Sequence, residues 1–536
     1  AAPKRFPPLA WPLDSSSRRT MGVLALGRLI SAQRERRRQR QRQRRRRTQA
    51  RDDPVPLLAK RGRSSWQQDD RSEGRKRVKY SGPDIPQKIW RHIISLVPMQ
   101  DAARAACVSH AFLRCWRFYP NIGFSNLTVG CNGVLTKAET SRKFASKVNQ
   151  VLKNHSGIGL KTIKLEFLGH NSSDCSSLNS WLRVAITSEL EELSLVLSSE
   201  VATYRFPCSL LSGLRGNSIR YVHLSGCVFR PVVRLSCFKS LMNLRLYHLR
   251  ISEDELGCLL SSCSALELFS FGYCNEITCL KIPDMLQRLN DLQVVGCNDL
   301  RVVESKALNL SSFYFGGKRG QISHGEQLKN LTMPHPRALD NAHAMLPTSM
   351  PNLETLDISL RLKTDTPMMH SQFLRIKYLR ITVDVYSFPH INDYISLVPF
   401  LDASPCLESF YLQVAEPMEH DSIFRDPSPL RRMPGHRHDK LKSVKIIGFN
   451  SAKSLIELTV HIIENAGSLE SLTLDTADCS LGCSDSETER CSTLGQSTLM
   501  EVPRALFAIR RYVEGIVPST VKLDVLEPCA RCCNAS

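Results

Sequence analysis

The chain has 536 residues, 42% of them hydrophobic, which is too long for one compact core and suggests several domains or a repeat array. No apolar run approaches the roughly eighteen residues of a membrane span, and the stretch Met21 to Ile30 is short and interrupted by Arg28. This excludes a membrane-spanning protein and argues against a secretory signal. The 19 cysteines of a chain without that signal indicate reduced thiols.

The net charge of +21 is concentrated in the first 80 residues. They hold 24 Lys and Arg against 7 Asp and Glu, a net of +17 that leaves only +4 for the remaining 456 residues. The low-complexity run from Arg34 to Arg47 repels itself and cannot bury a core, so residues 1–80 are expected to be a disordered basic tail. The basicity therefore says little about the folded body.

Two basic clusters near the end of the tail fit a nuclear import signal, which is read as an extended charged peptide. A solvated linker explains them equally well. An organelle transit peptide is less favoured because the arginines are grouped in blocks rather than spaced along one helix face. We therefore expect the protein in the nucleus, the cytoplasm or both. The clusters comprise Lys60, Arg61, Arg63, Arg75, Lys76, Arg77 and Lys79.

Residues 81–124 are expected to form a small helical unit. Isoleucines and Leu96 recur at helical spacing, and Pro98 ends this first helix. A second helix is expected from Met99 to Tyr119, where neither Gly nor Pro occurs. A unit of about forty residues needs a partner surface for its exposed apolar side. Alternatively, it caps the end of a repeat array. One face of the second helix would carry Ala102, Ala105, Val108, Phe112 and Trp116.

After a linker with a helix over 125–159, the pattern apolar-x-x-apolar-x-apolar recurs thirteen times. Its spacing of 18 to 34 residues lies in or near the range of roughly 20–29 typical of leucine-rich repeats. The last two apolar positions are two residues apart and so face the same side of a short strand, here the interior. The fold class expected is therefore α/β, a solenoid of parallel strands. The copies begin at Leu160, Leu190, Ile219, Leu241, Leu266, Leu289, Leu310, Leu328, Leu353, Ile376, Leu407, Leu441 and Leu469.

Features between the strands also fit repeats. Cys227, Cys274 and Cys297 follow the last strand position by three residues, where a small buried side chain serves backbone groups in the turn. Ser252 to Leu260 is expected to be a short helix with a serine cap, and its acidic first turn complements the helix dipole. The long loop around Met418 to His438 is expected to shape a binding surface, and the cargo is expected on the later repeats.

Signatures of catalysis are absent from the sequence. It contains no Gly-x4-Gly-Lys, Gly-x-Ser-x-Gly or His-Glu-x-x-His motif. Cys529 and Cys532 form a single Cys-x-x-Cys pair, for which free thiols are favoured over zinc because structural zinc usually has two such pairs. His436 and His438 have no carboxylate beside them in the sequence pattern and are interpreted as a solvated basic loop. We therefore expect no enzyme activity, no cofactor and no metal.

The helical unit resembles the F-box of plant F-box proteins with leucine-rich repeats. Ile85 stands where leucine is common and Phe112 where tryptophan is common, and both remain large and apolar. The stretch from Leu441 to Glu470 resembles the FBD module that such proteins often carry. The residues that carry the F-box resemblance are Ile85-Pro86, Ile89, Ile93, Leu96-Val97-Pro98, Ala102-Ala103, Val108-Ser109, Phe112 and Trp116.

This resemblance completes the predicted domain organisation. A disordered tail (1–80) would precede an all-α F-box (81–124), the linker (125–159) and the leucine-rich-repeat solenoid (160–435). FBD-like final repeats (436–476) would be followed by a C-terminal loop and cap segment (477–536), with a final helix and strand between Val513 and Cys533.

The resemblance implies a non-enzymatic substrate receptor of an SCF-type, cullin-RING ubiquitin ligase. The F-box would dock onto a Skp-type adaptor by burying apolar anchors, and the repeats would hold a target protein. The alternative is a nuclear nucleic-acid-binding or scaffold protein that uses the basic tail, whose affinity would fall steeply with salt. The adaptor-binding residues expected are Ile85, Pro86, Ile89, Ile93, Leu96, Val97, Pro98, Val108, Phe112 and Trp116.

Overall fold

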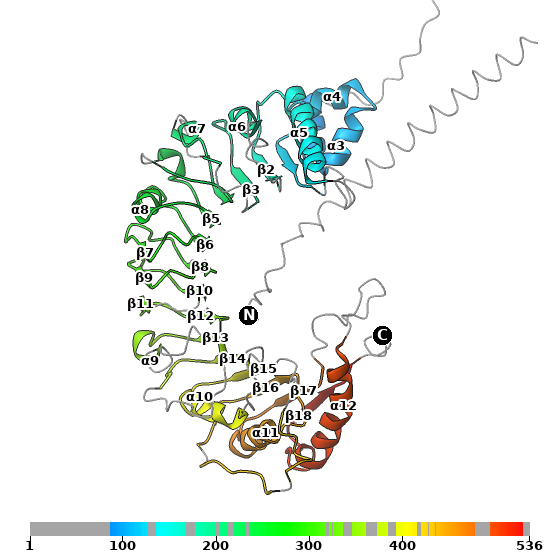
Figure 1. Cartoon of the computed structure of the whole chain (residues 1–536), viewed down its shortest axis with the longest axis vertical. Helices are drawn as coiled ribbons and strands as arrows, with labels where there is room; N and C mark the ends of the chain where they lie inside the picture. The colour runs from blue at the N-terminus through cyan, green and yellow to red at the C-terminus, as the bar shows by residue number, and fades with distance from the viewer. Residues whose placement is uncertain are drawn as a thin grey trace, which may run out of the picture. The chain divides into compact units, whose positions relative to one another are not determined.

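The computed structural model divides the chain into two compact units, Ala1–Leu165 with Ser180–Leu190 and Glu166–Asn179 with Glu191–Ser536 (Figure 1). The basic tail with both import clusters, Ile85, and Cys529 and Cys532 lie outside the described residues. The described residues are 86–126, 128, 136–167, 177–198, 204–212, 218–231, 235–317, 321–323, 325–335, 346–360, 372–383, 393–414, 420–426, 428–434, 436–477 and 494–528.

The first unit begins with three short helices, α2 (Gln87–Ser95), α3 (Met99–Ala106) and α4 (His110–Trp116). The single helix expected from Met99 to Tyr119 is wrong, because the chain breaks before Ser109, whose hydroxyl caps α4 by accepting the Ala111 N–H at 3.2 Å. The Tyr119 hydroxyl donates to the Val97 carbonyl at 2.7 Å and so links the end of α4 to the turn after α2. The core of the three helices comprises Ile94, Val97, Ala102, Ala105, Phe112, Cys115, Trp116 and Tyr119.

The rest of the first unit starts the repeat pattern one copy earlier than expected. Strand β1 (Asn121–Phe124) pairs in parallel with β2 (Thr162–Phe167), so that Ile122 lies beside Ile163. Between them lies α5 (Lys137–Asn154), which begins with a capping box made by Thr136 and Glu139. The predicted linker therefore holds an 18-residue helix.

The second unit is built on parallel strands in register, as the repeat pattern predicts. Neighbouring strands align repeat on repeat, for example Leu193 beside Val222. All thirteen sequence copies become strands, β2 and then the first twelve of the following: β3 (Glu192–Leu197), β4 (Tyr221–Ser225), β5 (Asn243–Tyr247), β6 (Leu268–Gly272), β8 (Asp291–Val295), β10 (Ser312–Gly316), β12 (Asn330–Met333), β13 (Thr355–Leu360), β14 (Tyr378–Val383), β15 (Ser409–Val414), β16 (Ser443–Ile447), β17 (Ser471–Asp475) and β18 (Lys522–Leu526).

Strand β18 is a further repeat that the pattern missed. It pairs in parallel with β17, which puts Leu523 beside Leu472 and Val525 beside Leu474. Thr520 occupies the first position of this copy, where the other copies have an apolar residue, so the pattern does not match. The segment before it forms α12 (Gln496–Ala508), continued by the π-helical turn η6 (Ile509–Val513). The final strand was expected, whereas the final helix begins earlier than Val513.

The segments that return between strands follow the length of each repeat. Where successive copies are close together, the return is extended and forms a second parallel sheet of β7 (Cys279–Ile282), β9 (Val302–Ser305) and β11 (Gln321–Ser323). Figure 1 shows these short strands on the same side of the long sheet as α8 and α9. The helical returns are α6 (Leu178–Ala185), α7 (Ser209–Ser212), η3 (Ser236–Phe238), α8 (Glu253–Leu260), α9 (Leu346–Ser349), η4 (Tyr394–Leu397), α10 (Val398–Asp402) and α11 (Lys453–Asn465).

Two sequence details of the returns are confirmed. Ser252 and Glu255 form a capping box at the start of α8. The buried Cys274 thiol accepts the Leu249 N–H at 3.4 Å and donates to the Gly272 carbonyl at 3.2 Å, so it does serve backbone groups in the turn. Among the described helices, none combines the length and apolar character that crossing a membrane requires.

Candidate functional site

The helical unit exposes large apolar side chains although its own core is filled. Ile89 is 49% exposed, Leu96 56% and Val108 37%. Ile89, the half-buried Ile93 and Leu96 follow one another at helical spacing and share one side of the first helix. Exposed apolar side chains gathered in this way mark an interaction surface. We call this surface the adaptor face; its exposed members are Pro86, Ile89, Leu96, Pro98 and Val108.

Three of the expected adaptor-binding residues lie inside the unit instead. Val97, Phe112 and Trp116 are 2%, 9% and 6% exposed. The Phe112 ring meets Trp90 edge-on at 5.2 Å between centroids, and Trp116 stacks on Tyr119 at 5.4 Å. These side chains therefore hold the adaptor face in shape rather than forming it.

The second unit carries a second candidate surface, the outward positions of its parallel strands. Along β4 and β5, the Arg245 guanidinium lies 5.8 Å from the Tyr221 ring, and His223 meets Tyr247 edge-on at 5.7 Å. Burial, aided by the Arg245 charge, lowers the pKa of His223 to about 4. His223 is therefore neutral at pH 7 and offers a hydrogen-bonding, uncharged ring.

A similar group lies further along the same face, on β13 to β16. The Arg380 guanidinium stacks on the Tyr411 ring at 4.4 Å and donates to the Gln413 carbonyl oxygen at 2.8 Å, and Lys445 lies 5.9 Å from the same ring. Burial raises the pKa of Asp357, an effect that Arg380 opposes. Tyr and Arg are the residue types that dominate protein-binding hot spots. We call the outward residues of β4 to β16 the strand face.

Sequence reasoning identified the buried strand positions but did not name the strand face. The signal was present, because the residues between two buried positions of a strand must point to the other side. In β5 these are Asn243, Arg245 and Tyr247. Their mutual contacts, by contrast, depend on the register between strands that are more than twenty residues apart.

The loop expected to shape the cargo surface packs on a helix instead. We call residues 420–438 the strap. The Arg431 backbone N–H and guanidinium both donate to the Glu457 carboxylate at 2.8 Å, and the guanidinium also binds Asp393 at 2.8 Å. Lys453 of the same helix, α11, reaches Asp426 at 2.6 Å. The described part of the strap is thus held by internal ion pairs, and the expectation that it forms the cargo surface is corrected.

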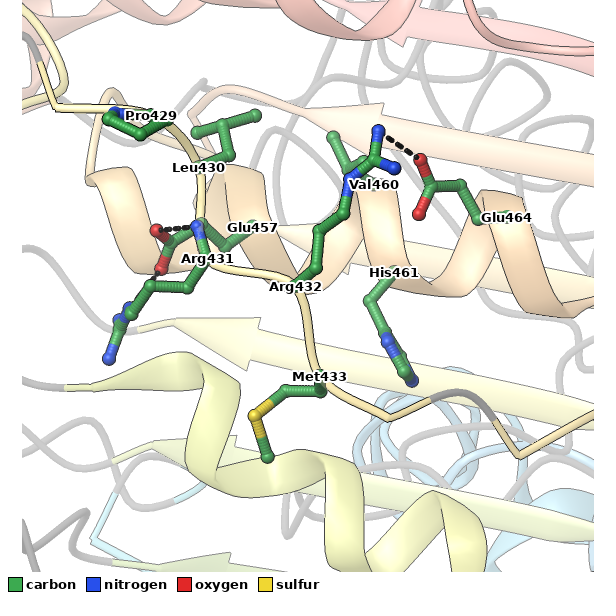
Figure 2. Close-up of a pocket in the computed structure, with 9 residues that line it drawn as sticks. All are labelled: Pro429, Leu430, Arg431, Arg432, Met433, Glu457, Val460, His461 and Glu464. Carbon is green, nitrogen blue, oxygen red and sulfur yellow. Dashed lines mark hydrogen bonds and ion pairs between the residues drawn. The ribbon is translucent and has the colours of Figure 1, made fainter.

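A cavity of about 280 Å³ lies between the strap and α11. Figure 2 shows Arg431, Arg432 and Met433 of the strap on one side and Glu457, His461 and Glu464 of the helix on the other. Both arginines lining it are engaged, Arg431 with Glu457 and Arg432 with Glu464. The cavity therefore offers no unpaired guanidinium to a ligand.

The interpretation of His436 and His438 as a solvated loop without a carboxylate is wrong. Asp402, at the end of α10, lies 3.4 Å from the His436 ring and 3.6 Å from the His438 ring. His438 is buried, and His461 of α11 approaches it with ring centroids 6.2 Å apart. Sequence alone could not find this group, because its members come from three separate segments.

Known protein families match both units. The F-box domain model matches residues 83–121, and the model of the At1g61320/AtMIF1 LRR domain matches residues 151–530. The chain belongs to the At1g61320/AtMIF1 LRR domain family. This membership and the F-box match give the protein a general role as an F-box substrate adaptor that works through protein–protein contacts.

Relatives in Arabidopsis thaliana carry the same combination. The chain is similar to the F-box protein At5g03100, with 25% identity over 40% of this chain and 62% of that protein. It is similar to the putative F-box/FBD/LRR-repeat protein At5g56810, with 24% identity over 73% of this chain and 88% of that protein. The match to the putative F-box/LRR-repeat protein At5g02930 has 25% identity and covers 41% and 42%. The chain thus spans less than two thirds of two of these relatives.

Among solved structures, the chain is similar to an internalin from Listeria monocytogenes. The identity is 13%, the match covers 62% of this chain and 81% of the internalin, and the TM-score is 0.25. No conclusion about the At1g61320/AtMIF1-type chain is drawn from this likeness.

Proposed function

We propose that this chain is the substrate-recognition subunit of an SCF-type, cullin-RING ubiquitin ligase. Its F-box docks onto a Skp-type adaptor, its leucine-rich repeats bind the target protein, and the chain itself performs no chemistry. It acts in the nucleus, the cytoplasm or both. Residues 436–476 serve as an FBD-type end of the repeat array.

The observation that carries the proposal is the adaptor face of the F-box. A helical unit with a filled core gains nothing for its own stability by exposing Ile89 and Leu96 to water. Burying a side chain of this size against a partner contributes about 1.5–3 kcal/mol. Two such side chains on one side of a helix suit insertion into an apolar groove of the adaptor.

Co-purification with a Skp-type adaptor tests the docking step. Ile89→Asp and Leu96→Asp each place a charge in the proposed groove, and we expect either change to remove the adaptor from the purified complex. Leu308→Asp is the matched control, because Leu308 is an equally exposed leucine, 67%, in the second unit. Adaptor recovery that is unchanged in both F-box variants while their melting curves match the wild type contradicts the proposal.

The strand face is proposed as the target-binding surface. Arg380 and Tyr411 are half-buried, stack on each other and are not part of the buried core. In cells where the ligase reaction is blocked, Arg380→Ala with Tyr411→Ala should lose the target while still recovering the adaptor. Equal recovery of target by this variant and by the wild type contradicts the assignment of the target to the strand face.

A further inference from the structure

Three buried side chains from separate parts of the second unit converge on one point. Asp402 ends α10, His438 lies in the turn before β16, and His461 lies in the middle of α11. One donor atom of each residue lies within 4.8 Å of the donor atoms of the other two. The two histidine side chains are each about 5% exposed.

The converging atoms lack hydrogen-bond partners. Asp402 Oδ1, His438 Nε2 and His461 Nε2 are all inaccessible to solvent and form no hydrogen bond, the shortest approach being the 3.6 Å between Asp402 Oδ1 and His438 Nε2. Leaving a buried polar atom unsatisfied costs about 1–3 kcal/mol. Three such atoms that face one another therefore indicate a shared ligand.

The rest of the group is arranged to hold these atoms in place. The His438 backbone N–H donates to the Asn465 carbonyl at 2.9 Å, which fixes the strap to the end of α11. His436 lies 3.4 Å from the second carboxylate oxygen of Asp402. Burial lowers the pKa of both His438 and His461, and thus favours the neutral imidazoles that bind metal ions.

We propose that Asp402, His438 and His461 bind a divalent transition-metal ion of the zinc class, which ties the strap to α10 and α11. Two imidazole nitrogens and one carboxylate oxygen are a donor set that zinc accepts, at metal–ligand distances of about 2.0–2.2 Å. Donor atoms at that radius lie roughly 3.3 Å apart in a tetrahedron, so the three side chains close in slightly when the ion binds. Water or the exposed His436 supplies the remaining position.

The proposal specifies the tautomer of His461. An ion on Nε2 leaves the ring proton on Nδ1, which lies 3.4 Å from the Asn465 side-chain amide. Rotation of that amide presents its oxygen to the Nδ1–H, in place of the present bond from the amide to the His461 carbonyl. Such an acceptor behind a metal-binding imidazole is the usual arrangement in zinc sites.

Zinc titration of the metal-stripped full-length chain tests the site. We expect one zinc ion per chain by calorimetry, and a rise in melting temperature on adding it. Asp402→Asn, His438→Gln and His461→Gln should each weaken zinc binding at least about tenfold, which is about 1.4 kcal/mol. His420→Gln is the matched control, because His420 is a partly buried histidine of the same strap that bonds Ser451 and Glu501 instead.

The C-terminal cysteines are the other possible source of zinc binding in the full chain. A Cys529→Ser, Cys532→Ser, Cys533→Ser variant should keep the expected ion. Cobalt substituted for zinc in the wild type should show ligand-field bands without a thiolate charge-transfer band, a readout that does not depend on any variant folding. Absence of stoichiometric zinc in the wild type, a thiolate band, or zinc retained by all three ligand variants overturns the proposal.

Discussion

Arg431 of the strap holds the carboxylate of Glu457 in α11, with 2.7 Å between Nη2 and Oε2. The Glu457 side chain is completely buried, whereas the Arg431 side chain is 52% exposed. The Arg431 backbone N–H binds the other carboxylate oxygen at 2.8 Å. A buried carboxylate that depends on one strap residue makes this contact the main electrostatic attachment of the strap.

Arg431→Ala is expected to destabilise the second unit by about 2 kcal/mol, because it leaves the Glu457 charge buried with only a backbone donor. Arg432→Ala provides the control, since its pair with Glu464 is 3.4 Å long and its side chain is 80% exposed. That change should stay within about 0.5 kcal/mol. Urea unfolding followed by circular dichroism measures both, and equal losses would show that burial of Glu457 is unimportant.

Two glycines are expected to respond in opposite directions to alanine. Gly448 has φ +72°, and a Cβ there would collide with the Val414 carbonyl oxygen of the neighbouring repeat. Gly448→Ala should therefore lower stability by more than about 1 kcal/mol. Gly257 lies in α8 with open space around its would-be Cβ, so Gly257→Ala should raise stability by about 0.5–1 kcal/mol. Thermal unfolding midpoints that move in the same direction would contradict this reading of the turns.

Glu501 is expected to make the protein sensitive to acid. Burial alone would raise its pKa, but hydrogen bonds from His420 and Ser451 hold the pKa at about 2, below the ordinary 4.5. Because the folded-state pKa is the lower one, the stabilisation is fully present above pH 4.5 and is lost as the pH falls toward 2. Glu501→Gln should lower stability at pH 7 and flatten the decline below pH 4.5.

The pH profile of Glu501→Gln needs a comparison within the same segment. Glu514→Gln removes an exposed carboxylate close to the end of that helical segment and should keep the wild-type profile. Unfolding free energies measured from pH 7 to pH 2 decide the matter. A wild-type slope that survives in Glu501→Gln would assign the acid sensitivity to other groups.

The repeat cysteines are expected to be chemically silent. Burial raises the pKa of the Cys274 thiol to about 12, whereas Cys107 is exposed at the end of α3. The thiolate is the reactive form, so an alkylating reagent at pH 8 should modify Cys107 quickly and Cys274 only after denaturant is added. Peptide mass spectrometry resolves the two sites. Comparable rates in the native protein would mean that the turn around Cys274 opens readily.

The sequence predicted the strands well because their cause is local. A buried side chain such as Leu244 or Leu246 appears in the spacing of apolar residues, and the same spacing recurs in every copy. It failed at β18, where Thr520 breaks the pattern although Leu523 and Val525 keep the register. It also joined α3 to α4, because the capping role of Ser109 carries no more weight in a pattern than any other serine.

The sites were harder to predict than the strands. Helical spacing found Ile89 and Leu96 but could not separate them from the buried Phe112, since packing among the three helices decides which side faces water. The group of Asp402, His438 and His461 depends on folding that brings three segments together, and no motif spans it. Contacts of this kind are set by tertiary packing, not by local pattern.

The most direct test of the central claim is the equilibrium affinity between a purified Skp-type adaptor and the full-length chain, measured by calorimetry. We predict saturable one-to-one binding that weakens at least about a hundredfold in Ile89→Asp with Leu96→Asp, because two buried apolar anchors are replaced by charges. Leu308→Asp should bind like the wild type. A folded wild-type chain that does not bind the adaptor, or a double variant that binds it as tightly as the wild type, would contradict the assignment.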